Sequence, residues 1–346
     1  MALHTSVRLQ RDRGSAQPWL TRPMLVTLLL LASYPLWAER VGLYPYLGIE
    51  VAIWMLYGLG YNLLLGYTGL PAFGHGAFLG VGAYAYGLCY LAGWQNPLLC
   101  LALGALAGGV AAGLVGALVA RRRGIYFALL TIACGQVFWF VAIKAHSLTG
   151  GEDGLLNIRR PALGGLTLAD DVALYYLVLV ALAAAIVALW RLLHSPLGMA
   201  LQAIRMNEAR ARCVGYDVAR TQWTVMALSG FVAGLAGSLL TLAQESAYPD
   251  VMSLHSSGFI VMAVLIGGGT VSFWGPVLGA LVFILARDLL GAVTSSWPFW
   301  YGLLFMGVVL FQPEGIAGAW QRYRHKLRSR VVAAAASSNE GPRGAV

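Results

Sequence analysis

GYTGLPAFGHGAFLGVGAY, residues 66–84, sets six glycines, a threonine, a proline and a histidine between two long apolar runs. From Gly76 onward the small residues recur every three or four positions, so they share one helix face, as Gly230, Gly234 and Gly237 do later in the chain. Small residues on such a face let helix backbones approach closely inside a membrane. The stretch therefore predicts a transmembrane helix in close contact with another helix.

The first six residues of the stretch, GYTGLP, break the helical pattern with two glycines and a proline. Two interpretations fit this break. It is either an ordinary turn between two spans, which topology alone favours, or non-helical backbone at membrane depth, which is tolerated only where protein or a water-filled cavity surrounds it. His75, which follows, is also open to two interpretations. It is a functional ionisable group or, as the lack of a nearby acidic partner favours, a neutral histidine bonded to a neighbouring helix.

The composition indicates a membrane protein. Of the 346 residues, 59% are hydrophobic and 11% are charged, and the mean hydropathy is +0.72. Apolar runs of about 20 residues recur, the length at which a helix crosses a hydrocarbon core of about 30 Å. We therefore predict an all-α fold, a polytopic transmembrane helical bundle of about ten spans. The expected spans are roughly 24–38, 46–65, 70–92, 97–119, 125–145, 172–192, 223–243, 255–270, 274–290 and 298–317.

Basic residues mark one side of the bundle. Arginine and lysine gather before the first span, at 121–123, at 191–220 and at 322–330. The positive-inside rule places these segments, and with them both termini, in the cytoplasm. The weak point is 255–290, which either crosses twice or forms a re-entrant hairpin that reduces the number of spans to eight. The formal net charge of +9 is therefore explained by the orientation of the chain in the membrane and does not indicate nucleic-acid binding.

The predicted organisation is a cytoplasmic N-terminal tail (1–22), a transmembrane domain (23–320) and a basic, disordered, cytoplasmic C-terminal tail (321–346). We expect no cofactor, no metal site and no catalytic residues, because no metal-ligand motif, nucleophile–base set or Walker motif stands out. An enzyme is therefore the least favoured class. The four cysteines are scattered and form neither a metal-ligand pair nor a disulfide framework; they are Cys89, Cys100, Cys134 and Cys213.

HSPLGMALQAIRMNEARARCVGYDVARTQ, residues 194–222, lies between two spans and is amphipathic. Ser195 and Pro196 predict a helix start, and Gly215 predicts a stop. One face carries Leu197, Leu201 and Ile204, and another carries Arg205, Glu208 and Arg212, with Glu208 and Arg212 spaced as an i,i+4 ion pair. Such a helix can lie on the lipid surface, pack on loops of its own chain or dock into a groove of a partner.

Several motifs, in the same order along the chain, resemble the LivM-type permease subunit of branched-chain amino acid ABC importers over about residues 45–320. They are GYTGLPAFGHGAFLGVGAY (66–84), TGGEDGL (149–155), SPLGMALQAIRMNEARARCVGYDVARTQ (195–222), VLIGGGTVSFWGPVLGA (264–280) and YGLLFMGVVLFQPEGIAG (301–318). The sequence departs from the family pattern at Pro71-Ala72, Gln136 and Met199. These departures leave the substrate open, because urea and short-chain amide importers have closely similar permeases.

The resemblance implies a multi-pass permease of the bacterial inner membrane that carries branched-chain amino acids. It implies four partners besides the lipid bilayer: a second, LivH-like permease subunit, two ATP-binding subunits and a periplasmic substrate-binding protein. The coupling helices at 194–222 would contact the ATPase through Leu201, Ile204, Arg205, Asn207, Glu208, Arg212 and Gly215. The substrate pathway would include Thr68, Gly69, Phe73, His75, Thr131 and Gln136. An outer loop or gate would include Thr149, Gly150, Gly151 and Asp153.

An autonomous secondary transporter is the less favoured alternative from the residues alone. Proton coupling uses buried carboxylates. Those near the spans are Glu50, Glu245 and Asp288, which lie near predicted span ends or beside Arg287.

Overall fold

The computed structural model describes residues 22–41, 44–119, 122, 124–163, 166–268, 272–294, 296–311 and 315–319. The two predicted tails lie outside these ranges, apart from Arg22 at the end of the N-terminal tail. Helices dominate the described residues. They are α1 (Arg22–Ala32), α2 (Tyr34–Val41), α3 (Pro45–Leu65), α4 (Gly76–Leu91), α5 (Pro97–Val119), α6 (Gly124–Lys144), α7 (His146–Thr149), α8 (Asp171–Leu193), α9 (Pro196–Met206), α10 (Glu208–Cys213), α11 (Val218–Gln244), α12 (Leu254–Gly267), α13 (Gly275–Val293) and α14 (Trp297–Phe311), with the 3-10 turns η1 (Gly151–Asp153) and η2 (Pro249–Met252).

One small element departs from the all-α prediction. Strands β1 (Ala162–Leu163) and β2 (Leu166–Thr167) pair antiparallel, with Ala162 opposite Thr167. They lie in the connection between α7 and α8, where the chain runs outside the long helices and needs no helix to satisfy its backbone.

Six described helices are long and apolar enough to cross a membrane, namely α3, α5, α6, α8, α11 and α13. They match six of the expected spans, and the chain is a multi-pass membrane protein. Two further expected spans, 70–92 and 255–270, correspond to α4 and α12, which have only 16 and 14 residues. At a rise of 1.5 Å per residue these reach about 24 and 21 Å, which is less than a hydrocarbon core. The first expected span is divided at Ser33 between α1 and α2.

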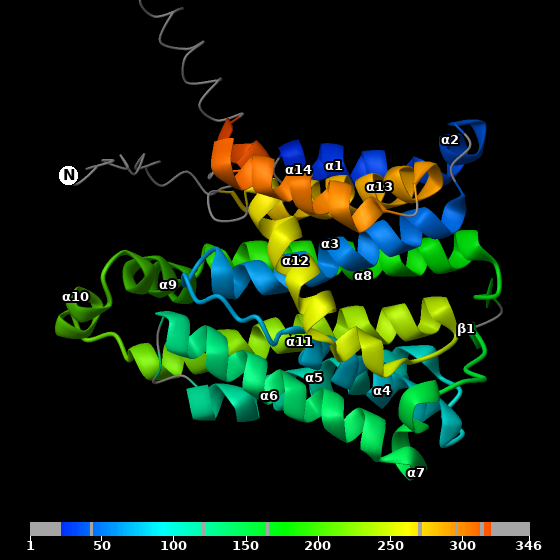
Figure 1. Cartoon of the computed structure of the whole chain (residues 1–346), viewed down its shortest axis with the longest axis horizontal. Coiled ribbons are helices and arrows are strands. Elements are labelled where there is room, and N and C mark those ends of the chain that lie inside the picture. Colours follow the sequence, from blue (N-terminus) through cyan, green and yellow to red (C-terminus); the bar gives the residue numbers. More distant parts are fainter. Residues whose placement is uncertain are drawn as a thin grey trace, which may run out of the picture.

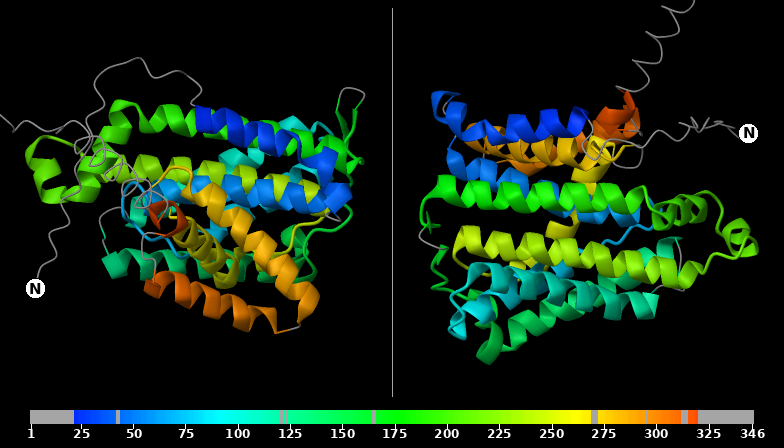
Figure 2. Two further views of the ribbon diagram at one scale, coloured as in Figure 1. Left: turned by 90° about the horizontal axis from the view of Figure 1, so that it is seen from above. Right: turned by 180° about the vertical axis from the view of Figure 1, so that it is seen from behind.

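The long helices run side by side, so the bundle has two distinct ends (Figure 1). Helices α9 and α10 project from one end, and α7 and β1 lie at the other. Viewed from above, α3 and α11 form a central row (Figure 2). Helices α1 and α8 lie on one side of this row, and α14 lies on the other side. We call the two ends the α9–α10 end and the α7 end.

Both short helices begin near the middle of the bundle. After α3 the non-helical residues 66–75 lead to α4, and His75 there lies between the central turns of α3 and α11, with its ring 5.3 Å from that of Tyr57 and its Nε2 2.8 Å from Ser229 Oγ. After α11 the chain turns back through η2 to α12. The two helix starts meet where the Gly76 amide donates to Ser257 Oγ at 2.8 Å. The break at 66–75 thus begins beside Arg205 at the α9–α10 end, where Gly69 is exposed, and ends in buried backbone near the middle of the bundle at His75.

Close backbone contacts join α11 to α4 and α5. A Cβ added at Gly82, Gly104, Gly108, Gly230, Gly234 or Gly237 would overlap a facing backbone or side-chain atom across this seam. The prediction of a small-residue seam is confirmed for the three glycines of α11. On α4 the contact is made by Gly82, whereas Gly76 and Gly80 pack against residues 251–257 and Gly87 against Leu155 and Ile158. Hydroxyls reinforce the seam, since Ser238 Oγ donates to the carbonyl of Gly82 at 3.1 Å.

The α7 end is held by Arg160. Its guanidinium donates to Asp171 Oδ1 at 2.7 Å and to the Ala243 carbonyl at 2.8 Å. An isolated bridge between Leu155 and Ala247 adds a second link. The start of α8 and the end of α11 are therefore fixed to one connecting segment.

The seam predicts unequal effects of one substitution at two glycines. Gly237→Ala places a Cβ on the Leu79 carbonyl, whereas Gly302 has nothing within 4 Å. We expect Gly237→Ala to destabilise the protein by about 1–3 kcal/mol, the usual cost of overpacking, and Gly302→Ala to leave stability unchanged or slightly raised because alanine is the better helix former. Thermal unfolding in detergent measures this. Equal melting temperatures for the two variants would contradict the seam.

The ends of α4 and α5 predict a crosslink that the cysteine spacing did not suggest. Cys89 Sγ and Cys100 Sγ lie 2.8 Å apart as free thiols. We expect copper phenanthroline to join them, with the two thiols losing two protons and two electrons to the oxidant. Maleimide–polyethylene glycol labelling of the denatured chain would then modify only Cys134 and Cys213. In Cys89→Ser, oxidation should no longer protect Cys100; unchanged labelling of the oxidised parent protein would refute the contact.

Candidate functional site

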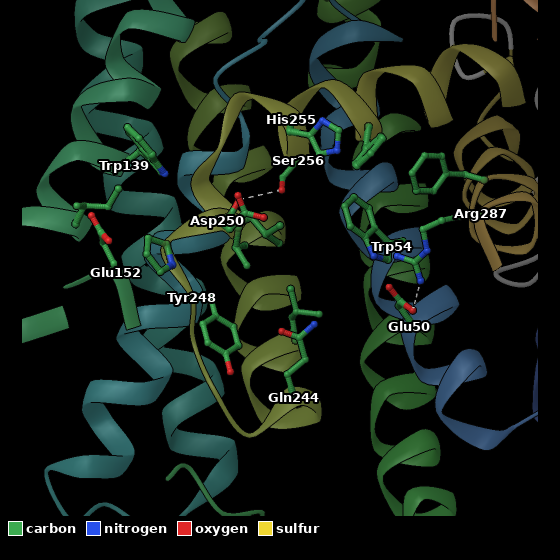
Figure 3. Close-up of a pocket in the computed structure, with 17 residues that line it drawn as sticks. Glu50, Trp54, Trp139, Glu152, Gln244, Tyr248, Asp250, His255, Ser256 and Arg287 are labelled. Carbon is green, nitrogen blue, oxygen red and sulfur yellow. Dashed lines mark hydrogen bonds and ion pairs between the residues drawn. The ribbon is translucent and has the colours of Figure 1, made fainter. Parts of the chain in front are cut away.

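A cavity of about 540 Å³ opens in the α7 half of the bundle, within the usual size range of small-molecule sites. Its walls come from α3, α4, α6, α11, α12 and α13, with η1 and η2 at its edge (Figure 3). The cavity forms beside the start of α12, because the chain reaches this helix through η2 at depth. Two segments that are far apart in sequence, around Glu50 and around Arg287, lie side by side in one wall of the cavity.

One wall has two layers, one charged and one aromatic. Arg287 Nη2 donates to Glu50 Oε2 at 2.6 Å, and the two side chains are 29% and 12% exposed. One helical turn along α3 and α13 from this pair lie Trp54 and Phe283, whose rings are 5.9 Å apart. The spacing is i,i+4 on both helices, so each charged residue stands directly above an aromatic residue on the same face.

Helix α12 extends the aromatic layer. The ring of Phe259 lies 5.1 Å from that of Phe283 and 4.0 Å from the imidazole of His255. Trp139 from α6 and Tyr248 before η2 complete the aromatic lining on the other side. The deeper part of the cavity is therefore suited to an apolar group.

Carboxylates outnumber cations along the rim. Glu152 and Asp250 line the cavity together with the Glu50–Arg287 pair, and both are exposed. Among the described residues, Glu50 is the one acid within ion-pair distance of Arg287, and neither Glu152 nor Asp250 is within that distance of a cation. The excess of carboxylates therefore favours a positively charged group, and the guanidinium of Arg287 can bind an anionic group.

The six predicted pathway residues lie elsewhere. None of Thr68, Gly69, Phe73, His75, Thr131 and Gln136 is among the residues that line the cavity. Thr68 and Thr131 are buried; the Thr68 hydroxyl donates to the Leu64 carbonyl in the last turn of α3, and the Thr131 hydroxyl donates to the Ala128 carbonyl of its own helix. The structure does bring the 66–75 segment to α6, because a Cβ at Gly74 would overlap the Thr131 carbonyl.

His75 is fully buried among aromatic rings of α3 and α4. Ser229 Oγ donates to the Gly60 carbonyl at 2.7 Å, so it accepts the bond from His75 Nε2, which assigns the proton of a neutral imidazole to Nε2. This geometry joins α3, α4 and α11 through one histidine. It favours the interpretation of His75 as a neutral, hydrogen-bonded packing residue.

The predicted outer loop forms a tight turn beside the cavity. Thr149 Oγ1 donates to the Ala142 and Ala145 carbonyls, and Gly150 and Gly151 have φ of 73° and 69°. A side chain at Gly151 would collide with His146. Asp153 is exposed, and its neighbour Glu152 is the residue of this turn that lines the cavity.

The predicted coupling segment consists of two short helices, with a break at Asn207. Asn207 caps α10 by accepting from the Arg210 amide at 3.0 Å, and Gly215, with φ of 99°, follows its end. The predicted ion pair is confirmed, since Arg212 Nη2 lies 3.0 Å from Glu208 Oε1. Leu201 and Ile204 are 0% and 4% exposed, so they anchor α9 to the chain itself.

Arg205 connects α9 to the end of α3. Its Nη1 donates to the Gly66 carbonyl, and its Cγ lies 3.7 Å from the Cβ position of Gly69. Burial lowers the pKa of this guanidinium from its ordinary value. The carbonyl of Gly66 lies past the last turn of α3, where helix carbonyls lack intrahelical partners, so Arg205 supplies one.

Sequence reasoning missed Trp54, Phe259, Phe283 and Tyr248 altogether. It noted Glu50 and Arg287 only as charges near span ends. One signal in the sequence could have indicated this wall of the cavity. Each of two apolar segments contains a charged residue four positions from an aromatic residue, namely Glu50 with Trp54 and Arg287 with Phe283. The pairing of these two segments could not be predicted, because 237 residues separate Glu50 from Arg287.

Comparison with known proteins agrees with the motif resemblance. Residues 46–312 match the family model described as "Branched-chain amino acid transport system / permease component". The high-affinity branched-chain amino acid transport system permease protein LivM of Escherichia coli (strain K12) is 30% identical over 84% of this chain and 74% of its own length. LivM of Salmonella typhimurium (strain LT2) is 27% identical over 85% and 74%.

A shorter match is to the probable branched-chain amino acid transport permease protein LivH of Methanocaldococcus jannaschii, 30% identical over 41% of this chain and 48% of that protein. No solved structure gives a significant match. The chain therefore belongs to the family of permease components of branched-chain amino acid transport systems.

Proposed function

We propose that this chain is one permease subunit of an ABC importer that carries branched-chain amino acids across the bacterial inner membrane. It pairs with a second, LivH-like permease, two ATP-binding subunits drive it, and a periplasmic binding protein delivers the substrate. The family membership supports the substrate class, and no feature of the described residues favours urea or an amide instead. An autonomous secondary transporter has no support from the family or from His75.

The observation that carries the proposal is the α9–α10 pair, which projects from one end of the bundle (Figure 1). This pair is anchored by buried Leu201 and Ile204 and yet leaves Met206 and Val214 70% and 74% exposed. Exposed apolar side chains on a segment outside the spans are typical of a protein contact. A short helix held rigidly by two spans transmits the movement of an ATPase subunit to the bundle.

The proposed topology has ten spans with both termini in the cytoplasm, α9–α10 on the cytoplasmic side and the α7 end on the periplasmic side. In this arrangement four further spans are short. Two of them are α1–α2 taken together and α14. The other two are α4 and α12, whose crossings are completed by the non-helical segments that precede them. The basic residues at 121–123 and 191–220 then lie inside. The turn at 149–153 lies outside, where it contacts the binding protein or acts as part of a gate.

The coupling role predicts that a charge on the exposed apolar surface separates the permease from its ATPase. We expect Met206→Asp and Val214→Asp to abolish co-purification of the ATP-binding subunits and leucine uptake, because a carboxylate would be buried without a partner. Met206→Leu keeps the apolar surface and serves as the control. Full ATPase association in both aspartate variants would show that α9–α10 docks elsewhere.

The substrate class predicts a competition pattern in cells that express the whole transporter. Uptake of radiolabelled leucine should be suppressed by excess isoleucine or valine and unaffected by excess urea or acetamide, since only the amino acids present an apolar side chain with a zwitterionic head. A Val214→Asp strain measures background uptake. Suppression by urea would instead assign the chain to the urea and amide importers.

A further inference from the structure

The cavity between α3, α12 and α13 matches the chemistry of an amino acid that is zwitterionic at one end and apolar at the other. We propose that this cavity is a substrate subsite within the permease, where the amino acid leaves the binding protein and waits before it crosses. This assignment rests on the proposed function. It adds a defined place for the substrate and names the residues that hold it.

The charged layer fits the head group. A guanidinium has five N–H donors, of which one Nη2 donor is engaged by Glu50 at 2.6 Å. The substrate carboxylate binds Arg287 beside Glu50, and the substrate ammonium binds Glu50. The protein ion pair and the substrate zwitterion thus lie with opposite charges next to each other, so that each partly buried charge keeps a partner.

The carboxylates of the rim add to this preference. Glu152 of η1 and Asp250 of η2 also line the cavity and are not within ion-pair distance of a described cation. Their negative charge attracts the ammonium group into the cavity. An anion without an ammonium group is repelled by the same two side chains, which favours amino acids over simple carboxylic acids.

The aromatic layer fits the side chain. Trp54 and Phe283 lie one helical turn, about 5.4 Å, below the ion pair, and Phe259 packs on Phe283 at a centroid distance of 5.1 Å. A side chain that descends from the α-carbon of a head group held at Glu50 and Arg287 therefore meets three rings. The depth of this layer limits the length of the side chain, so Phe259 is a specificity-determining residue.

The first experiment measures selectivity in the complete importer, reconstituted in liposomes with its binding protein and ATP. Phe259→Trp fills the deeper layer, so leucine import should fall roughly tenfold more than import of the shorter valine, the scale of one methylene in a tight pocket. The control is Phe299→Trp, on the 67% exposed Phe299 of α14, which should leave the leucine-to-valine ratio unchanged. Because both substrates pass through the same importer, the ratio does not depend on how much of it is folded.

The second experiment tests the charged layer. Arg287→Gln and Glu50→Gln should lower leucine import by roughly tenfold or more, since each removes a charge-assisted hydrogen bond to the head group, while ATP hydrolysis stimulated by the loaded binding protein persists. Asp171→Asn, which alters the Arg160 ion pair outside the cavity, should retain import. Where a glutamine variant fails to assemble, the Phe259→Trp ratio decides.

Two failures are distinguishable. If the unaltered importer carries leucine, but Phe259→Trp keeps the parental leucine-to-valine ratio or assembled Arg287→Gln imports leucine at the parental rate, the subsite is wrong and the proposed function stands. If the unaltered importer carries no amino acid at all, the proposed function is wrong and the subsite falls with it.

Discussion

The direct contact between the backbones of α11, α4 and α5 is the constraint on which the rest of the fold depends. Lipid tails are as apolar as the helices, so a membrane bundle gains little from the hydrophobic effect and relies on close packing and hydrogen bonds. Gly82, Gly108, Gly234 and Gly237 permit that approach, and Ser238 bonds across it. Because α11 is fixed in this way, it provides a packed surface against which α4 begins at the centre of the bundle, and the start of α12 packs in turn on the start of α4.

Those two short helices in turn create the space at the site. A spanning helix satisfies its own backbone, whereas a helix that begins at depth needs partners for its first amides. Ser257 supplies one to Gly76, and Ser253 supplies another to Ser256. The chain between α11 and α12 then passes beside the cavity, which places Asp250 and His255 near charged and aromatic residues of α3 and α13.

Helix α3 runs from the cavity to the α9–α10 end of the bundle. Near its first turn Glu50 is bonded to Arg287 at the cavity, and past its last turn the Gly66 carbonyl is bonded to Arg205 of α9. A rigid helix with both ends held offers a physical connection between the proposed ATPase contact and the proposed substrate subsite. The neutral His75 fixes the middle of α3 to α11 through Ser229, so movement of α3 would involve the core of the bundle.

The sequence by itself determined the membrane class, six long spans, the start of α9 at Pro196 and the α11 glycine seam, since each depends on local composition or spacing. Only the tertiary structure decided that α4 and α12 begin at depth, that Leu201 and Ile204 face their own chain, and that Glu50 meets Arg287. Apolar runs look alike whether a helix crosses fully or starts halfway. Contacts between residues far apart in the chain depend on how helices pack, which helical periodicity does not encode.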